Sequence, residues 1–183
     1  MELFGTCSLN KFIKGQNIGK LSDDQAKHVF RQIAQGIKAL HDKGFCHRDL
    51  KVTNMLIDHN TLKVKIIDFG FACFSQDKLR MYCGTKSYMP PELVKRLPYD
   101  GKAMDMWAIG VVLFKLLTGD YPFGADGDDK LDSNIVNCEY KVPFFVSVKA
   151  KDLIQKILQP VSSERYSIKQ ASTLSFQANL PRS

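Results

Sequence analysis

The sequence predicts one mainly α-helical domain, a helical bundle around a buried central helix with small β-hairpins beside it. Three observations support this prediction. The chain of 183 residues is long enough to bury one substantial core. Apolar residues recur every three or four positions after residue 22, which is the period of a helix. The stretch from residue 103 to 117 is apolar on nearly every side, as in a helix surrounded by protein.

The first clear helix is expected over residues 22–44. Ser22 and Gln25 have the spacing of a capping box, in which each side chain binds the other's backbone N–H. Gly44 supplies the residue that commonly ends a helix. The apolar positions expected to face the core are Ala26, Val29, Phe30, Ile33, Ala34, Ile37 and Leu40.

Short strands are expected next, over residues 45–47, 55–57 and 64–67, with residues 58–60 forming the turn between the last two. Residues 71–91 show no period and are rich in glycine, proline and polar residues. An irregular segment of that length is usually functional, so we interpret it as a regulatory loop.

Three further helices are predicted in the second half of the chain. The central helix covers residues 102–118 and is closed by Gly119. The others run over residues 147–158 and from residue 167 into the 170s, each entered through a serine cap. In the 147–158 helix the apolar positions are Val148, Leu153, Ile154 and Ile157.

Composition argues against several classes of protein. The net charge of +7 is spread along the chain without interleaved aromatic residues, so a nucleic-acid partner is not favoured. Five scattered cysteines without a C-x-x-C pair indicate reduced thiols rather than zinc ligands. The apolar stretches are shorter than the roughly 20 residues of a membrane span, and the chain does not open with a signal sequence. We therefore expect a cytoplasmic protein that does not enter membranes.

Five motifs occur in a fixed order. His47-Arg48-Asp49-Leu50-Lys51-Val52-Thr53-Asn54 lies between two expected strands, and Asp68-Phe69-Gly70 follows the next one. Pro90-Pro91-Glu92, then residues 105–110 in the central helix, and finally Arg165 complete the set. One such motif alone is more often a turn or core packing than a site. Together they resemble the carboxy-terminal lobe of a eukaryotic-type protein serine/threonine kinase.

This resemblance implies a chemistry of positioning and charge neutralisation. It implies that Asp49 is the catalytic base and that Lys51 places a positive charge beside the transferring phosphate of ATP. Asn54 and Asp68 would hold Mg²⁺ through hard oxygen ligands. The adenine would contact Leu56 and the backbone of Glu2 and Phe4, and the substrate would be a protein serine or threonine.

Other residues would support or regulate the site by the same resemblance. His47 and Phe69 would stack, Asp105 would cap the backbone of the catalytic loop, and Glu92 would form a buried ion pair with Arg165. In many kinases of this kind, the arginine that matches Arg48 binds a phosphothreonine four residues before the position of Thr85. Met81 stands at that position here, so Ser75, Tyr82 or an acidic side chain are the candidate partners of Arg48. Thr85 and Lys51 indicate serine/threonine specificity. Thr53 and Lys115 replace carboxylates of kinases that prefer arginine-rich substrates.

The resemblance covers nearly the whole chain but only about the last two-thirds of a kinase domain. We interpret residues 1–183 as the hinge and carboxy-terminal lobe, with the amino-terminal lobe absent and Met1 marking either a truncated reading frame or an artificially shortened chain. No G-x-G-x-x-G motif or V-A-I-K lysine is present. We therefore expect weak ATP binding and phosphate transfer near background.

An apolar face around Phe4, Met55, Leu56 and Ile66 would then be uncovered, and would aggregate or bind the missing lobe or a partner chain. The alternative to an enzyme is a non-catalytic kinase-like binding module. The segment from Cys83 to Glu92 is most similar to calcium/calmodulin-dependent and AMP-activated kinases.

Overall fold

The computed structural model describes residues 6–75, 78–124 and 126–174. Glu2 and Phe4, which were expected to contact adenine, lie outside these residues. The described strands are β1 Thr6–Ser8, β2 Phe45–Cys46, β3 Met55–Asp58, β4 Val64–Ile66 and β5 Cys73–Phe74. The described helices are α1 Leu9–Lys14, α2 Asp23–Asp42, α3 Pro91–Val94, α4 Gly101–Thr118, α5 Asp128–Val136, α6 Val148–Ile157 and α7 Ile168–Leu174. Short 3₁₀ turns lie at Val52–Asn54 and Lys86–Tyr88.

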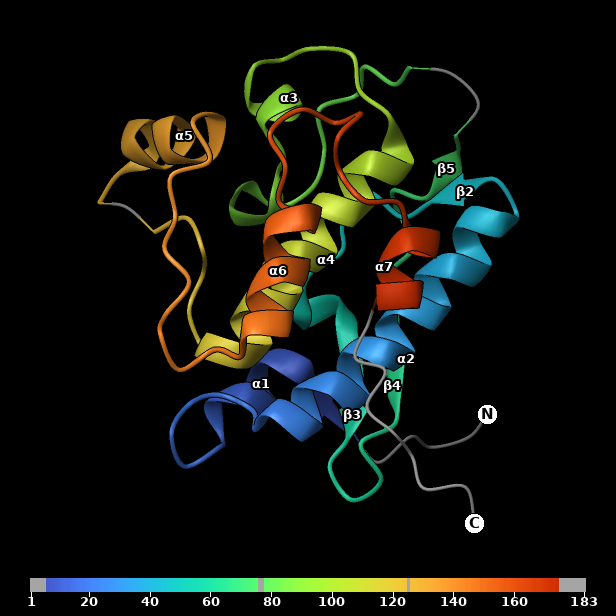
Figure 1. Cartoon of the computed structure of the whole chain (residues 1–183). Helices are drawn as coiled ribbons and strands as arrows, with labels where there is room; N and C mark the ends of the chain where they lie inside the picture. The colour runs from blue at the N-terminus through green and yellow to red at the C-terminus, as the bar shows by residue number, and fades with distance from the viewer. Residues whose placement is uncertain (1–5, 76–77, 125, 175–183) are drawn as a thin grey trace.

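Helix α4 runs through the middle of the domain, with α2 and α6 packed against it (Figure 1). Every residue from Met104 to Leu117 is buried, as the sequence predicted for a central helix. The Asp100 side chain caps its first turn by accepting from the backbone N–H groups of Lys102 and Ala103. Gly119, with φ 85°, ends it in the left-handed conformation that glycine adopts without strain.

Helix α2 begins as predicted. The Ser22 hydroxyl accepts from Gln25 N at 3.3 Å, and the Gln25 side chain accepts from Ser22 N at 3.1 Å. The prediction was wrong at its last turn, where Leu40 is half-buried and His41 is buried instead. His41 occupies the inward position because its ring binds a buried carboxylate of α4 at 2.9 Å.

Two small antiparallel sheets flank these helices. β3 is the middle strand of the order β1-β3-β4, and β2 pairs with β5. Because side chains alternate along a strand, Met55 and Ile57 point into the core while Leu56 lies on the opposite, half-buried face. The expectation that Met55 lies on an uncovered apolar face is therefore wrong.

Helix α6 starts after the predicted Ser147 cap, whose hydroxyl accepts from Ala150 N at 3.4 Å. Val148 was expected in the core but is 84% exposed, since the first helical residue points away from α4, and Ala150 is buried in its place. Among the described residues, no helix combines the length and apolar character that crossing a bilayer requires. The elements α1, α3, α5, β1 and β5 were not predicted.

Candidate functional site

Asp49 lies at the centre of a cluster of polar side chains on the loop between β2 and β3. Lys51 Nζ lies 2.8 Å from one carboxylate oxygen of Asp49. The hydroxyl of Thr85, 36 positions further along the chain, donates to the other oxygen at 3.0 Å. Lys51 Nζ also donates to Thr85 Oγ1 at 2.9 Å, which closes a triangle of three side chains. A carboxylate held in this way is oriented before any substrate arrives.

Asn54 fixes the same carboxylate from the other side of the loop. The 3₁₀ turn Val52–Asn54 brings its amide nitrogen to the Asp49 carbonyl and to a carboxylate oxygen, both at 3.0 Å. Asn54 is buried, and its amide oxygen is the atom that can still accept a hydrogen bond or bind a cation.

Asp68 follows β4 and is exposed, with φ 63°. Its carboxylate accepts from Gly70 N at 3.3 Å. The preceding residue, Ile67, donates its N–H to the Asn54 carbonyl at 2.9 Å, so the backbone brings Asp68 next to Asn54. No contact joins the Asp68 side chain to Asp49 or Asn54 in the described part of the chain.

The donor set formed by Asn54 and Asp68 fits Mg²⁺, which prefers hard oxygen ligands and retains water and phosphate oxygens in its other positions. Residues 6–75, 78–124 and 126–174 contain no group of three or more His, Cys, Asp or Glu side chains that could hold a metal ion. Among these described residues Asn54 and Asp68 would be the two protein ligands, and a phosphate-bearing ligand would complete the coordination.

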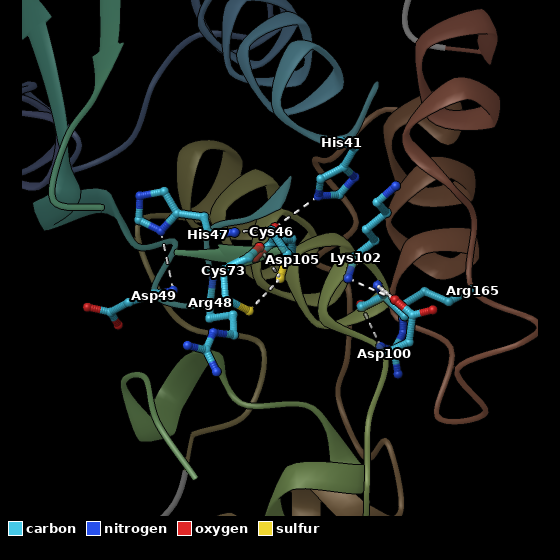
Figure 2. A network of polar contacts seen from close by, with 11 residues as sticks. His41, Cys46, His47, Arg48, Asp49, Cys73, Asp100, Lys102, Asp105 and Arg165 are labelled. Atoms are coloured by element: carbon cyan, nitrogen blue, oxygen red, sulfur yellow. Dashed lines mark hydrogen bonds and ion pairs between the residues drawn. The ribbon is translucent and has the colours of Figure 1, made fainter. Parts of the chain in front are cut away.

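A buried carboxylate of α4 holds the backbone of the catalytic loop. Asp105, which is 0% exposed, accepts from the backbone N–H groups of His47 and Arg48, each at 2.8 Å, and contacts His41 Nε2 at 2.9 Å. Figure 2 shows this network between the end of α2, the loop and α4. Arg48 has φ 67°, a left-handed conformation that is uncommon outside glycine. The two bonds to Asp105 stabilise it.

Arg48 and the regulatory candidates are arranged differently from a phosphate-binding cluster. Arg48 Nε donates to the Phe71 carbonyl at 2.6 Å, and Nη1 donates to the Tyr99 hydroxyl at 3.4 Å. Burial is the main cause that raises the pKa of Tyr99 to about 12. Ser75 is half-buried, and the exposed Tyr82 ring lies under the Arg96 guanidinium at 3.4 Å. The structure does not join Ser75 or Tyr82 to Arg48 by a described contact.

Glu92 and Arg165 form a two-pronged ion pair between α3 and the segment before α7, with N···O distances of 2.9 and 3.1 Å. Arg165 also donates to the carbonyls of Ala103 and Gln159, and its guanidinium lies 5.0 Å from the Trp107 ring. Each of the three guanidinium nitrogens of Arg165 therefore donates a hydrogen bond to an oxygen atom of the protein.

The rings of His47 and Phe69 contact each other, with centroids 4.8 Å apart. Phe69 is 50% exposed and lines an apolar cavity of about 310 Å³ between α2 and β4. This surface, rather than the Met55 face, carries accessible apolar area beside the site.

Sequence reasoning missed two residues near Asp49. The Tyr88 hydroxyl accepts from Val52 N at 3.5 Å, and its ring packs edge-on against Tyr121. His41 supports Asp105. Tyr88 lies in the Cys83–Glu92 segment but was given no role, and His41 belongs to no motif; only its position one turn after Ile37 indicated that it faces the core.

A helical domain whose His47–Asn54 loop is anchored to the central helix, beside a turn carrying Asp68, has the arrangement that the motifs of a protein kinase predict. The profile of the protein kinase domain matches residues 1–176, and the chain belongs to the eukaryotic-type protein serine/threonine kinase family.

Three relatives illustrate this membership. A probable serine/threonine-protein kinase HSL1 of Saccharomyces cerevisiae is 42% identical over 142 residues, which are 76% of this chain and 9% of that protein. CBL-interacting protein kinase 26 of Oryza sativa subsp. japonica is 41% identical over 155 residues, 82% of this chain and 31% of that protein. Serine/threonine-protein kinase SAPK3 of Oryza sativa subsp. indica is 36% identical over 174 residues, 90% of this chain and 52% of that protein. The chain thus spans about half or less of each.

Proposed function

We propose that this protein transfers the γ-phosphate of ATP to serine or threonine hydroxyls of protein substrates, with Mg²⁺. The observation that carries the proposal is the Asp49 carboxylate, held at hydrogen-bond distance by Lys51, Thr85 and Asn54 on a buried loop. A carboxylate so placed can accept or orient the proton of an attacking hydroxyl.

Each neighbour of Asp49 has a separate task in this proposal. Lys51 neutralises charge that develops on the transferring phosphate, and Thr85 keeps the carboxylate turned toward the substrate hydroxyl. Asn54 and Asp68 would hold Mg²⁺, which when bound neutralises the phosphate oxygens. His41 and Asp105 act through the loop backbone and are positioning residues.

We further propose that residues 1–183 carry the hinge and carboxy-terminal lobe, and that Leu56, with the Glu2 and Phe4 backbone, contacts adenine. Leu56 is half-buried on the outward face of β3, which is compatible with this role. The half-exposed Phe69 and its cavity would pack against an amino-terminal lobe or a partner chain.

Two proposals concern regulation and substrate choice. An activating phosphate on Ser75 or Tyr82 would have to reach Arg48 by displacing its bonds to Phe71 and Tyr99. Arginine-rich substrates are not favoured, because Thr53 is uncharged and Lys115 is a cation buried 3.8 Å from the Tyr121 ring.

The role of Asp49 is tested by Asp49→Asn in the full-length protein, assayed with Mg²⁺-ATP and a serine- and threonine-containing substrate. The expected loss in phosphate transfer is about 10²- to 10⁴-fold, with unchanged thermal unfolding. Asp152→Asn is the matched control, because that carboxylate is exposed and pairs with Lys156 on α6. Equal rates for Asp49→Asn and the parent protein would overturn the proposal.

The 183-residue polypeptide by itself is expected to transfer phosphate near background, because its sequence contains no G-x-G-x-x-G motif and no V-A-I-K lysine. A rate from this polypeptide that matches the rate of a full-length relative would contradict that expectation.

The second candidate function is a non-catalytic kinase-like binding module, which the half-exposed Phe69 beside its apolar cavity favours. A full-length protein that is inactive with and without Asp49→Asn, but that loses partner binding on Phe69→Ser, would favour the module.

A further inference from the structure

Cys46 and Cys73 stand directly opposite each other on the two strands of the smaller sheet. They are 27 positions apart in sequence and are paired in the antiparallel register of β2 and β5. Residues facing each other in such a ladder have Cα atoms about 4.5–5.5 Å apart, which lies inside the range that a disulfide spans. Their sulfur atoms are 3.6 Å apart, as the dashed line in Figure 2 indicates.

The two thiols differ in their access to solvent. Cys46 is 0% exposed, and a Cβ atom at Gly101 would come within 2.3 Å of its sulfur, so the start of α4 closes over it. Cys73 is half-buried. A small oxidant therefore reaches Cys73 first, and the space around Cys46 excludes a bulky adduct.

The chain positions of the pair connect it to the proposed site. Cys46 directly precedes His47-Arg48-Asp49, and Cys73 lies shortly after Asp68-Phe69-Gly70. A bond between the two sulfurs would place Asp49, Asn54 and Asp68 on one covalently closed loop.

We propose that Cys46 and Cys73 form a redox modification site, at which hydrogen peroxide converts the two thiols into an intramolecular disulfide between β2 and β5. The Cys73 thiol gives up its proton and its sulfur attacks one peroxide oxygen; the S–O bond forms, the O–O bond breaks, and the departing hydroxide takes up that proton as water. The Cys46 sulfur gives up its proton and attacks the Cys73 sulfur; the S–S bond forms, the S–O bond breaks and water leaves. Two thiols and one peroxide thus give one disulfide and two waters.

The electrostatics assign the same order to the two steps. Burial, and next the Asp105 carboxylate, raise the pKa of Cys46 to about 12. Cys46 therefore remains a thiol at neutral pH and does not attack peroxide itself. Its sulfur contacts both the Cys73 carbonyl, at 3.5 Å, and the Cys73 sulfur, so it is in place for the second step.

The test treats the native protein with hydrogen peroxide, blocks remaining thiols and maps tryptic peptides by mass spectrometry without reduction. Trypsin releases Cys46 in residues 44–48 and Cys73 in residues 66–78, each peptide with one cysteine. The expected product is these two peptides joined, about 2 Da lighter than their sum, and separated again by dithiothreitol.

Three variants make the result specific. In Cys46→Ser, Cys73 stops at the sulfenic acid, so its labelling by dimedone rises several-fold over the parent protein. In Cys73→Ser, Cys46 stays unmodified. Cys138→Ser is the matched control, because Cys138 is also half-buried but its thiol donates to the Leu158 carbonyl at 3.2 Å, and the joined peptide still forms.

Three outcomes would overturn the proposal: Cys73 labelled by dimedone equally with and without Cys46, disulfide-linked dimers in place of the joined peptide, or the same pairing in urea-unfolded protein. The mass measurement needs no phosphate transfer, so this proposal and the proposed function fail independently.

Discussion

At the scale of single residues, Asp105 and Arg165 are two buried charged groups with different kinds of partner. Asp105 accepts hydrogen bonds from two backbone N–H groups and contacts the His41 ring. Arg165 receives a full opposite charge from Glu92 and shares its other protons with carbonyl oxygens. Burying either charge without these partners would cost several kcal/mol.

The first prediction concerns Glu92→Ala. It leaves the Arg165 guanidinium buried without its counter-charge and should lower the free energy of unfolding by about 3–5 kcal/mol, measured by urea denaturation. The matched control is Asp152→Ala, which breaks an exposed pair with Lys156 and should change the free energy of unfolding far less. Equal losses for the two variants would show that burial does not govern the Glu92–Arg165 pair.

Residues of the site could be predicted only where they belong to a motif. Asp49, Asn54 and Asp68 were named from their spacing, whereas the bond from Thr85 to Asp49 spans 36 positions and depends on how the chain folds back. Tyr88 was missed for the same reason. No local pattern specifies a contact between distant turns.

At the scale of elements, α4 and α6 pack so closely that a glycine is required between them. A Cβ atom at Gly110 would lie 2.6 Å from Ile157 Cγ2 and 2.8 Å from Leu158 Cδ2. The absence of a side chain there sets the distance between the two helices.

The second prediction follows from this contact. Gly110→Ala should destabilise the protein by about 1–3 kcal/mol in urea denaturation, despite the better helix propensity of alanine. The control is Gly36→Ala in α2, where the new methyl group would meet only the end of the Ile66 side chain at 3.2 Å. Gly110→Ala being as stable as Gly36→Ala would contradict the required close approach.

The long helices could be predicted for two different reasons. Helices α2 and α6 present an apolar period behind a serine cap, whereas α4 is apolar on nearly every side over a length that suits a buried helix. Helix α5 was missed because only Ile135 of its residues is buried, which leaves no stripe to detect. Strand β5 was missed because it has two residues, and its pairing with the predicted strand β2, rather than its composition, defines it.

At the scale of the whole molecule, folding raises the pKa of several cysteine thiols and tyrosine hydroxyls, so these groups stay protonated at a higher pH than in the unfolded chain. Burial is the main cause that raises the pKa of Cys46 to about 12, of Cys138 to about 11 and of Tyr99 to about 12. The ordinary values are 9.0 for the thiols and 10.0 for the phenol. Because the folded pKa is the higher one, this stabilisation is complete below pH 9 and is lost as the pH rises toward 12.

The third prediction is therefore alkaline sensitivity. Between about pH 9 and 12 each such group should lower the free energy of unfolding by up to about 1.4 kcal/mol per pH unit. Urea titrations across this range should show a shallower loss in Cys46→Ser than in the control Cys7→Ser. Parallel curves for these two variants would show that Cys46 does not contribute.

The Asp105 carboxylate also couples the unfolding of the loop that carries Asp49 to the unfolding of α4. The amides of His47 and Arg48 are bound to a side chain that cannot leave without unwinding α4, so the loop has no separate melting step. In deuterium-exchange measurements these two amides should report the same opening free energy as the interior of α4. The loop that carries Asp49 would then unfold only together with the central helix.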